Sequence, residues 1–432
     1  MQAGRMQAKD GGMMLQTIYC RSVQAGMALA LRLLPWRQPQ CLCGAGAVLR
    51  VPELLAAAGL SRPLLVTGPH IAASGLLTPL CAALEAAEFG WQMFCAVESD
   101  PREETAERIR DAYQAAGCDA LLAVGGGSPL DAAKAAGALL ARPGRRLAQM
   151  YGTLRIRRPL PPLCAVPTTA GSGSEQTAVA VIRDAASGRK VALFDLCLLP
   201  RWAVLDPDLL AGLPQPALAA AGMDALAHAV EAFLCRMTAT RRVRAQASHA
   251  AAEILQTLEP ACHGDAAARA RLLVAASEAG AAFTRSGVGY AHALAHALGG
   301  RYGIAHGRAV AACLPPVLAY YGTAAERPLA ALAAAAGIAC GEKPAAAAQA
   351  FRREVAALGR RLGLPAGFAC IRQQDLPQLA AAVLAEAHPL YAVPRLLDRR
   401  ACQALLQALA AEGGQTATDS FPAAEKREEI SS

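Results

Sequence analysis

The sequence predicts an α/β N-terminal part built on a parallel sheet, followed by an all-helical C-terminal part. Short apolar runs alternate with helical stretches from about residue 61 to 205, which is the pattern of parallel strands joined by crossover helices. Alanine-rich helical segments, punctuated by glycine and proline, dominate from 206 to about 412. A chain of 432 residues is long enough for two domains of ordinary size.

The expected elements follow in chain order. Strand candidates are the apolar runs at 63–68, 89–97, 119–128 and 162–175. Helices are expected at 102–117, which has acids in its first turn, and at 131–141. The change of character near Gly212 divides the chain into an N-terminal extension, an α/β domain, a helical domain and a polar, disordered tail, at 1–40, 41–212, 213–412 and 413–432.

The first 40 residues are basic, with a single acid and an apolar stretch at 25–34 that Arg32 interrupts. A weak signal or transit peptide has this composition, and so does a tag that docks to a partner. The preferred expectation is a frayed or weakly helical extension ahead of the folded domain.

Composition excludes several classes of function. The net charge is +8, but no basic stripe is interleaved with aromatic residues, so nucleic-acid binding is not expected. No run of 18 apolar residues occurs, so a membrane span is not expected. The 14 cysteines are dispersed without a CxxC pair, which favours reduced, buried thiols and a cytoplasmic location.

Two small-residue loops each follow a strand candidate. The first, Gly125-Gly126-Gly127-Ser128, opens a helix, and glycines at a helix N-terminus allow a phosphate to approach backbone N–H groups. It is neither the GxGxxG fingerprint nor a Walker A motif, and such a turn is as often structural. The second, 167–175 (PTTAGSGSE), places hydroxyls where parallel sheets bind ligands, although a plain surface loop is the alternative.

A cluster of histidines and one aspartate indicates a metal site. Asp224 and His228 are spaced i,i+4, as are His292 and His296, so each pair shares a helical face. An Asp–His pair alone is more often a surface contact, but His306 brings a third histidine into a 15-residue segment. One aspartate and three histidines suit a divalent transition metal. These segments contain four histidines, so one remains for proton transfer.

These segments resemble the iron-containing (group III) alcohol dehydrogenase family from about residue 40 to 412. The motifs that carry the resemblance are GGGSPLDAAK (125–134), PTTAGSGSE (167–175), LAGLPQPALAAAGMDALAHAVEAF (210–233) and HALAHALGGRYGIAHG (292–307). The resemblance implies a Rossmann-like nucleotide-binding domain at 41–212 and a helical metal-binding domain at 213–412, the dehydroquinate synthase-like fold, with the site in the cleft between them.

The resemblance also implies residue roles. By this resemblance, the residues that bind the metal, Fe(II) or Zn, are Asp224, His228, His292 and His306, and the residue that transfers a proton near the nicotinamide is His296. Positions that match the family's pyrophosphate loop are Gly126, Gly127 and Ser128. Positions that match the lining of the adenine, ribose and nicotinamide are Thr168, Thr169, Thr177 and Lys190.

The implied activity is NAD(P)-linked interconversion of primary, short-chain alcohols and aldehydes, with the alcohol oxygen on the metal, and family members usually form homo-oligomers. Alternatives within the fold are a polyol or diol dehydrogenase (1,2- or 1,3-propanediol, glycerol, lactaldehyde) and a dehydroquinate synthase-type enzyme. A third alternative is a non-catalytic, scaffold-associated protein with the same fold. The complete set of metal ligands argues against it.

Three positions depart from the family pattern. The first strand ends in Thr67-Gly68, where the family often has Thr-Asp and uses that carboxylate to select NAD over NADP. Ala305 stands where a proline usually precedes the last ligand, and Val310-Ala311 replaces the usual Asn-Ala. The resemblance therefore implies NAD without excluding NADP.

Overall fold

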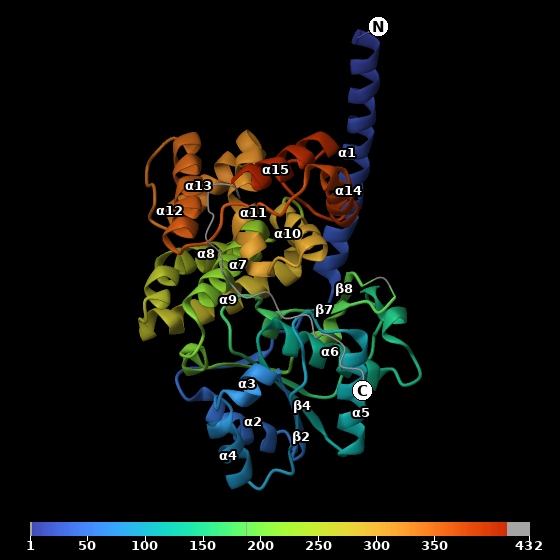
Figure 1. Ribbon diagram of the computed structural model, residues 1–432, viewed down its shortest axis with the longest axis vertical. Helices are drawn as coiled ribbons and strands as arrows, with labels where there is room; N and C mark the ends of the chain where they lie inside the picture. The colour runs from blue at the N-terminus through green and yellow to red at the C-terminus, as the bar shows by residue number, and fades with distance from the viewer. Residues whose placement is uncertain (1, 187, 413–432) are drawn as a thin grey trace, which may run out of the picture.

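The computed structural model describes the backbone of residues 2–186 and 188–412 and the side chains of 14–186 and 188–411. The tail expected at 413–432 lies outside the described residues. Figure 1 shows the two predicted parts, a sheet with its helices below and a helical part above. The α/β and all-α classes are therefore both confirmed.

The main sheet has six parallel strands in the order β1-β9-β6-β4-β2-β3. Its central strands are continuous apolar runs because helices cover both faces: Leu55 and Leu84 pack on one face of β4, and Ile109 and Ala132 on the other. The strands are β1 (Gln40–Cys43), β2 (Pro63–Val66), β3 (Gln92–Phe94), β4 (Ala120–Gly125), β6 (Leu163–Pro167) and β9 (Trp202–Leu205). The covering helices are α2 (Val51–Ala56), α3 (Pro69–Ala73), α4 (Thr78–Ala86), α5 (Glu103–Ala115) and α6 (Gly127–Ala141).

A small second sheet lies beside α6. It has the order β5-β8-β7, and β7 pairs antiparallel with β8. Its strands are β5 (Gly152–Thr153), β7 (Val179–Arg183) and β8 (Lys190–Phe194). Ala180, Ile182 and Leu193 pack against Ala135 and Leu139 of α6, so this sheet supports the helix that follows the glycine-rich loop.

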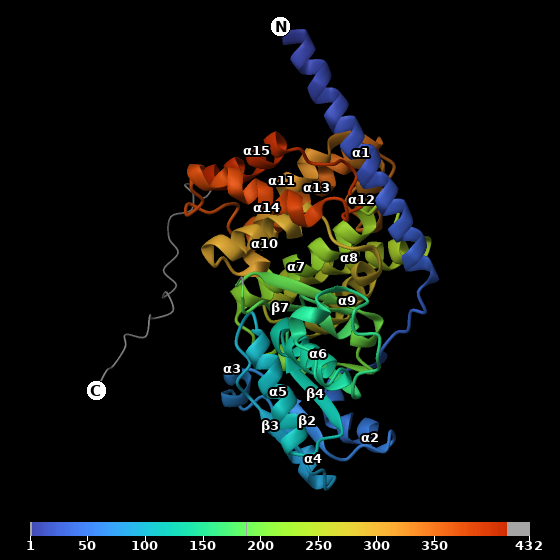
Figure 2. The same ribbon diagram turned by 90° about the vertical axis from the view of Figure 1, so that its right-hand side faces the viewer.

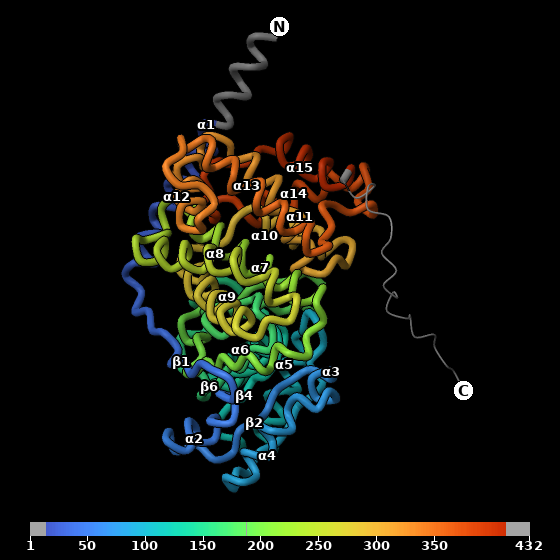
Figure 3. Tube along the Cα trace, turned by 90° about the vertical axis from the view of Figure 1, so that its left-hand side faces the viewer, coloured from blue at the N-terminus to red at the C-terminus, as the bar shows by residue number. Residues whose placement is uncertain are grey.

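From residue 213 to 412 the structure contains helices and no strand, and this part is built around α7 (Gln215–Leu234). By length and composition α7 could cross a membrane, but 83% of its apolar window is buried inside the molecule, as expected for the core helix of a bundle. Figure 3 shows the other helices stacked around and above it. They are α8 (Arg241–Cys262), α9 (Ala266–Ser286), α10 (Tyr290–Tyr302), α11 (His306–Tyr321), α12 (Glu326–Ala335), α13 (Pro344–Arg361), α14 (Leu376–Ala387) and α15 (Arg399–Glu412).

Two expectations differ from the structure. The N-terminal extension is a continuous helix, α1 (Gln2–Leu33), and Cys20, Gln24 and Ala28 bury one face of it. A frayed segment would not bury an i,i+4,i+8 stripe. The 14 cysteines are free, as expected, but five of them are exposed rather than buried: Cys41, Cys43, Cys95, Cys340 and Cys370.

Candidate active site

The candidate metal ligands come from three helices of the C-terminal part. Asp224 and His228 lie one turn apart on α7, His292 lies on α10, and His306 is the first residue of α11. One carboxylate oxygen, Asp224 Oδ1, lies 3.4 Å from His292 Nε2 and 3.4 Å from His306 Nε2. Segments that are about 70 residues apart in sequence therefore meet at a single point.

The cluster fits a bound divalent ion. Four ligand atoms held about 2.1 Å from a tetrahedral ion stand about 3.4 Å from one another, which is the spacing around Asp224. Three buried atoms of the cluster, on Asp224, His228 and His292, have no hydrogen-bond partner among the described residues. Because buried polar atoms normally have partners, the donor set and its unpartnered atoms suit Fe(II) or Zn.

His228 joins the cluster less directly than the other three. Donor atoms of Asp224, His292 and His306 all lie within 4.8 Å of one another, whereas the ring of His228 stacks on that of His292 at a centroid distance of 4.4 Å. On its other side it stacks on Phe283 at 4.1 Å. Burial lowers the pKa of His228 to about 3, so the imidazole is neutral and its lone pair is free to bind a metal.

Glu231 is a further member of the site that the sequence argument missed. Its carboxylate accepts from His292 Nδ1 at 2.5 Å and from the backbone N–H groups of Gly289 and Ala291 at 2.8 Å each. The bond at Nδ1 leaves His292 Nε2 facing Asp224, which is how a buried carboxylate orients a metal-binding histidine. The spacing of Asp224, His228 and Glu231, i,i+4,i+7 on one helical face, is the signal that could have found it.

The electrostatics of His292 favour a positive charge in the site. Burial opposes protonation, but the charges of Glu231 and Asp224 and the hydrogen bond to Glu231 raise the pKa of His292 to about 10. Burial has the opposite effect on an acid and raises the pKa of Asp224, yet the surrounding imidazoles, His228 foremost, hold this pKa well below its ordinary value. A metal ion at Nε2 would take the place of the proton that these groups attract.

His296 lies beside the cluster without being part of its carboxylate contacts. Its ring stacks on that of His306 at 5.2 Å, and its Nδ1 lies 2.7 Å from Glu386 Oε1. The same Glu386 oxygen accepts from the Tyr391 hydroxyl at 2.7 Å. Because a carboxylate only accepts, His296 Nδ1 donates, and Nε2 is the nitrogen left to take up a proton. No local pattern could reveal Glu386, which lies 90 residues away.

The glycine-rich loop opens a helix whose N-terminus has no side-chain cap. Gly126 is the N-cap of α6, and no side chain caps this helix end, so its first N–H groups are available to an anion. The second loop is adjacent: Gly125 pairs with Pro167, and Thr168 N–H donates to the Gly125 carbonyl at 2.9 Å. A Cβ on Gly127 would stand 3.2 Å from Ser172. The structure thus brings Gly126, Gly127, Ser128, Thr168 and Thr169 together.

Thr177 and Lys190 lie in different surroundings. The Thr177 hydroxyl is buried and lies 2.9 Å from the Nζ of Lys134, and Lys190 pairs with Asp100 at 2.5 Å. Lys134 is wholly buried and also donates to Ser174 and to the carbonyls of Thr177 and Val179. Burial lowers the pKa of Lys134 to about 8 against the pull of Asp131. Lys134 therefore ties α6 to the second loop. The sequence does not indicate this role, because an Asp–Lys pair spaced i,i+3, as Asp131 and Lys134 are, is typical of an exposed helix surface.

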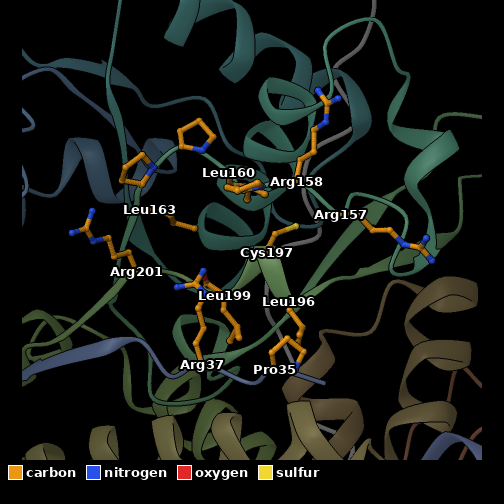
Figure 4. Close-up of a pocket in the computed structure, with 13 residues that line it drawn as sticks. Pro35, Arg37, Arg157, Arg158, Leu160, Leu163, Leu196, Cys197, Leu199 and Arg201 are labelled. Carbon is orange, nitrogen blue, oxygen red and sulfur yellow. The ribbon is translucent and has the colours of Figure 1, made fainter. Parts of the chain in front are cut away.

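A separate cavity of about 500 Å³ lies at the opposite edge of the sheet, near the amino ends of β6 and β9. Proline, leucine and four arginine side chains line it. In Figure 4 the side chains of Arg157, Arg158 and Arg201 extend away from one another. The Arg37 guanidinium donates hydrogen bonds to the carbonyls of Leu199 and Pro200. This cavity contains none of the candidate catalytic residues.

The chain matches known families along most of its length. The model of the iron-containing alcohol dehydrogenases matches residues 38–207, and that of the Fe-containing alcohol dehydrogenase family C-terminal region matches 218–410. The NAD-dependent methanol dehydrogenase of Bacillus methanolicus is 34% identical over 350 residues, which are 79% of this chain and 91% of that protein. The probable alcohol dehydrogenase EutG of Salmonella typhimurium is 38% identical over 286 residues, 65% of this chain and 71% of that protein.

Solved structures agree with this match. A crystal structure of 1,3-propanediol oxidoreductase superposes with a TM-score of 0.83 at 31% identity, covering 87% of this chain and 100% of the other. The alcohol dehydrogenase from Oenococcus oeni gives 0.83 at 27% identity, covering 87% and 99%. The fold, the donor cluster and the two family models lead to one conclusion: the chain belongs to the iron-containing alcohol dehydrogenase family and is a metal-dependent, NAD(P)-linked alcohol dehydrogenase.

Proposed function

We propose that this enzyme interconverts short-chain primary alcohols and aldehydes, with Asp224, His228, His292 and His306 holding Fe(II) or Zn. The observation that carries the proposal is the meeting of Asp224 Oδ1 with two histidine nitrogens at 3.4 Å each in a buried cluster with unpartnered atoms. When bound, the metal supplies Lewis-acid polarisation of the substrate oxygen, and the nicotinamide accepts or donates the hydride.

The chain's own residues orient the reactants and move the proton. Glu231 holds His292 in the tautomer that presents Nε2 to the cluster. His296, held by Glu386, takes up the alcohol proton at Nε2 or returns it during aldehyde reduction. The backbone N–H groups of Gly126, Gly127 and Ser128 hold the pyrophosphate, with Thr168 and Thr169 beside them.

Two further residues complete the proposed cofactor site. Thr177 supports the second loop through its contact with Lys134. Lys190, at the start of β8, forms an ion pair with Asp100, which lies in the loop that follows β3. Both are assigned to the region of the adenine, ribose and nicotinamide.

Gly68 bears on the choice of cofactor. An acid at the end of a nucleotide-binding strand bonds the ribose 2′-hydroxyl and repels a 2′-phosphate, and Gly68 has no side chain with which to do either. A Cβ at this position would stand 3.0 Å from the Val97 carbonyl oxygen, so the local backbone is built around glycine. We infer that the enzyme uses NAD and accepts NADP as well.

A diol or hydroxyaldehyde substrate is the second candidate. The 1,3-propanediol oxidoreductase likeness favours it, as does the lactaldehyde reductase of Escherichia coli, which is 31% identical over 79% of this chain and 90% of its own length. Among the departures from the family pattern, the one next to the metal cluster is Ala305, which stands beside His306 where the family usually has a proline. This change could alter the shape of the substrate end of the site.

The remaining inferences concern organisation. We propose a nucleotide-binding domain at 41–212 and a metal-binding domain at 213–412, since Gly212 lies between β9 and α7. A homo-oligomeric, cytoplasmic enzyme that binds neither nucleic acid nor membranes accords with the family and with the dispersed charge.

Turnover of aldehydes with both reduced nicotinamides is the expected result for the Fe(II)-loaded enzyme. Absorbance at the nicotinamide band would be followed with NADH and NADPH against short-chain aldehydes and hydroxyaldehydes, and with NAD and NADP against the corresponding alcohols and diols. Because Gly68 offers no carboxylate, kcat/KM for NADH and NADPH should lie within about tenfold, or about 1.4 kcal/mol. A preference above a hundredfold for NADH would contradict the role given to Gly68, and absence of turnover across the panel would contradict the proposed function.

Replacing His296 by alanine should lower kcat by about 100-fold, the usual contribution of a general acid–base group, while the metal content is unchanged. Metal analysis and steady-state kinetics on the same preparation would show this, with the surface variant His263→Ala as the control. An unchanged kcat would remove His296 from proton transfer, and loss of the metal would make it a ligand.

A further inference from the structure

The N-terminal helix α1 lies outside the region that the family models match, which begins at residue 38. Figures 1 and 2 show it running along the helical part before the chain enters the sheet part. One face of α1 is buried through Cys20, Gln24 and Ala28. The feature that requires explanation is Gln24, a polar side chain that is 0% exposed on a helix that could have packed with leucine.

Every polar group of the Gln24 amide has a partner. Its Nε2 donates to the carbonyls of Pro389 and Tyr391 at 2.9 and 2.8 Å, and its Oε1 accepts from Arg21 at 2.8 Å. Arg21 in turn donates to the carbonyls of Val393 and Pro394 at 2.9 and 3.3 Å. Two side chains of α1 thus satisfy four carbonyls of the segment 389–394.

That segment is irregular, and its second half is buried. It follows α14, and Ala392, Val393 and Pro394 are buried. A buried segment without regular structure needs partners for its backbone groups, and α1 supplies four of them. Loss of the α1 side chains would leave these carbonyls unsatisfied, and the segment would lose the contacts that hold its conformation.

The same segment contacts the proposed proton-transfer residue. Tyr391 donates from its hydroxyl to Glu386, whose Oε1 holds His296 Nδ1, each at 2.7 Å. His388, which precedes the segment, lies 2.7 Å from the Tyr290 hydroxyl of α10. The backbone of Tyr391 is therefore fixed by α1, and its side chain fixes the carboxylate that orients His296.

We propose that α1 is an intramolecular brace that positions His296 through the segment 389–394, with Gln24 and Arg21 as positioning residues. The inference rests on the proton-transfer role of His296 in the proposed function. The order of contacts is α1 to the Tyr391 backbone, the Tyr391 hydroxyl to Glu386, and Glu386 to His296.

The test uses Gln24→Met in the full-length, metal-loaded enzyme. Methionine keeps the volume but has no N–H donor. Loss of a positioning contact behind a catalytic histidine should lower kcat by about tenfold with little change in KM and none in metal content. Amide hydrogen exchange should quicken in the segment 389–394 and not in α10. Arg21→Gln should act in the same direction, with the exposed Arg32→Gln and Leu29→Ala as matched controls.

A double-mutant cycle separates positioning from general destabilisation. In a Tyr391→Phe background the link to Glu386 is already cut, so Gln24→Met should change kcat less than twofold further, the behaviour of coupled residues. An undiminished effect of Gln24→Met in that background would overturn the brace, as would faster exchange of the segment with unchanged kcat. If His296→Ala itself leaves kcat intact, the proposed role of His296 fails, whatever Gln24→Met does to hydrogen exchange.

Discussion

The His292→Ala variant is expected to lose the metal and the activity together. His292 is buried between Asp224 at 3.4 Å and Glu231 at 2.5 Å, so its removal deletes one donor and leaves Glu231 without the group it orients. The metal supplies several kcal/mol of stabilisation to the reacting oxygen, so kcat should fall by at least about 1,000-fold. Metal per chain and kcat, measured on one preparation, would check both.

Two further variants make this result interpretable. Asp224→Asn keeps the shape of the side chain while removing its charge, so it should also lose the metal. This variant provides the test if His292→Ala proves too unstable to purify. His249→Ala changes a histidine whose side chain is 61% exposed and should behave as wild type. A His292→Ala enzyme that kept both its metal and its turnover would show that the ligand set is wrong.

Lys134→Met is expected to cause the largest loss of stability. The wholly buried Lys134 ammonium lies 2.7 to 2.9 Å from five oxygens of residues 174–179, and its removal leaves them and Asp131 without their cation. Removing one partner of a buried charged network costs about 3–5 kcal/mol. Chemical denaturation would measure the free energy of unfolding, and quenching of NADH fluorescence would measure the loss of cofactor affinity.

The control for this variant is Lys343→Met. Lys343 is exposed at the start of α13, and its replacement should change the free energy of unfolding by less than about 0.5 kcal/mol, as for most surface changes. Equal stability of the two variants would show that Lys134 does not tie α6 to the second loop.

Local patterns predicted most of the architecture because each depends on near neighbours in the chain. Apolar runs marked β2, β4 and β6, whose residues are covered on both faces. The run at 89–97 was less informative: only Gln92–Phe94 forms a strand, since this strand is at the edge of the sheet and pairs on one side alone. The basic N-terminal segment has no strong apolar periodicity, so the docking of α1 was not predicted.

The sequence by itself determined the fold class, the two loops and the pool of metal donors, since i,i+4 spacing and glycine-rich turns are properties of contiguous residues. Only the tertiary structure placed Asp224 Oδ1 between His292 and His306. Only it joined Glu386, and through Tyr391 the helix α1, to His296. Apart from the local Tyr391–Glu386 pair, these contacts link residues about 70 or more positions apart, and no local periodicity records which buried side chains will meet when helices pack.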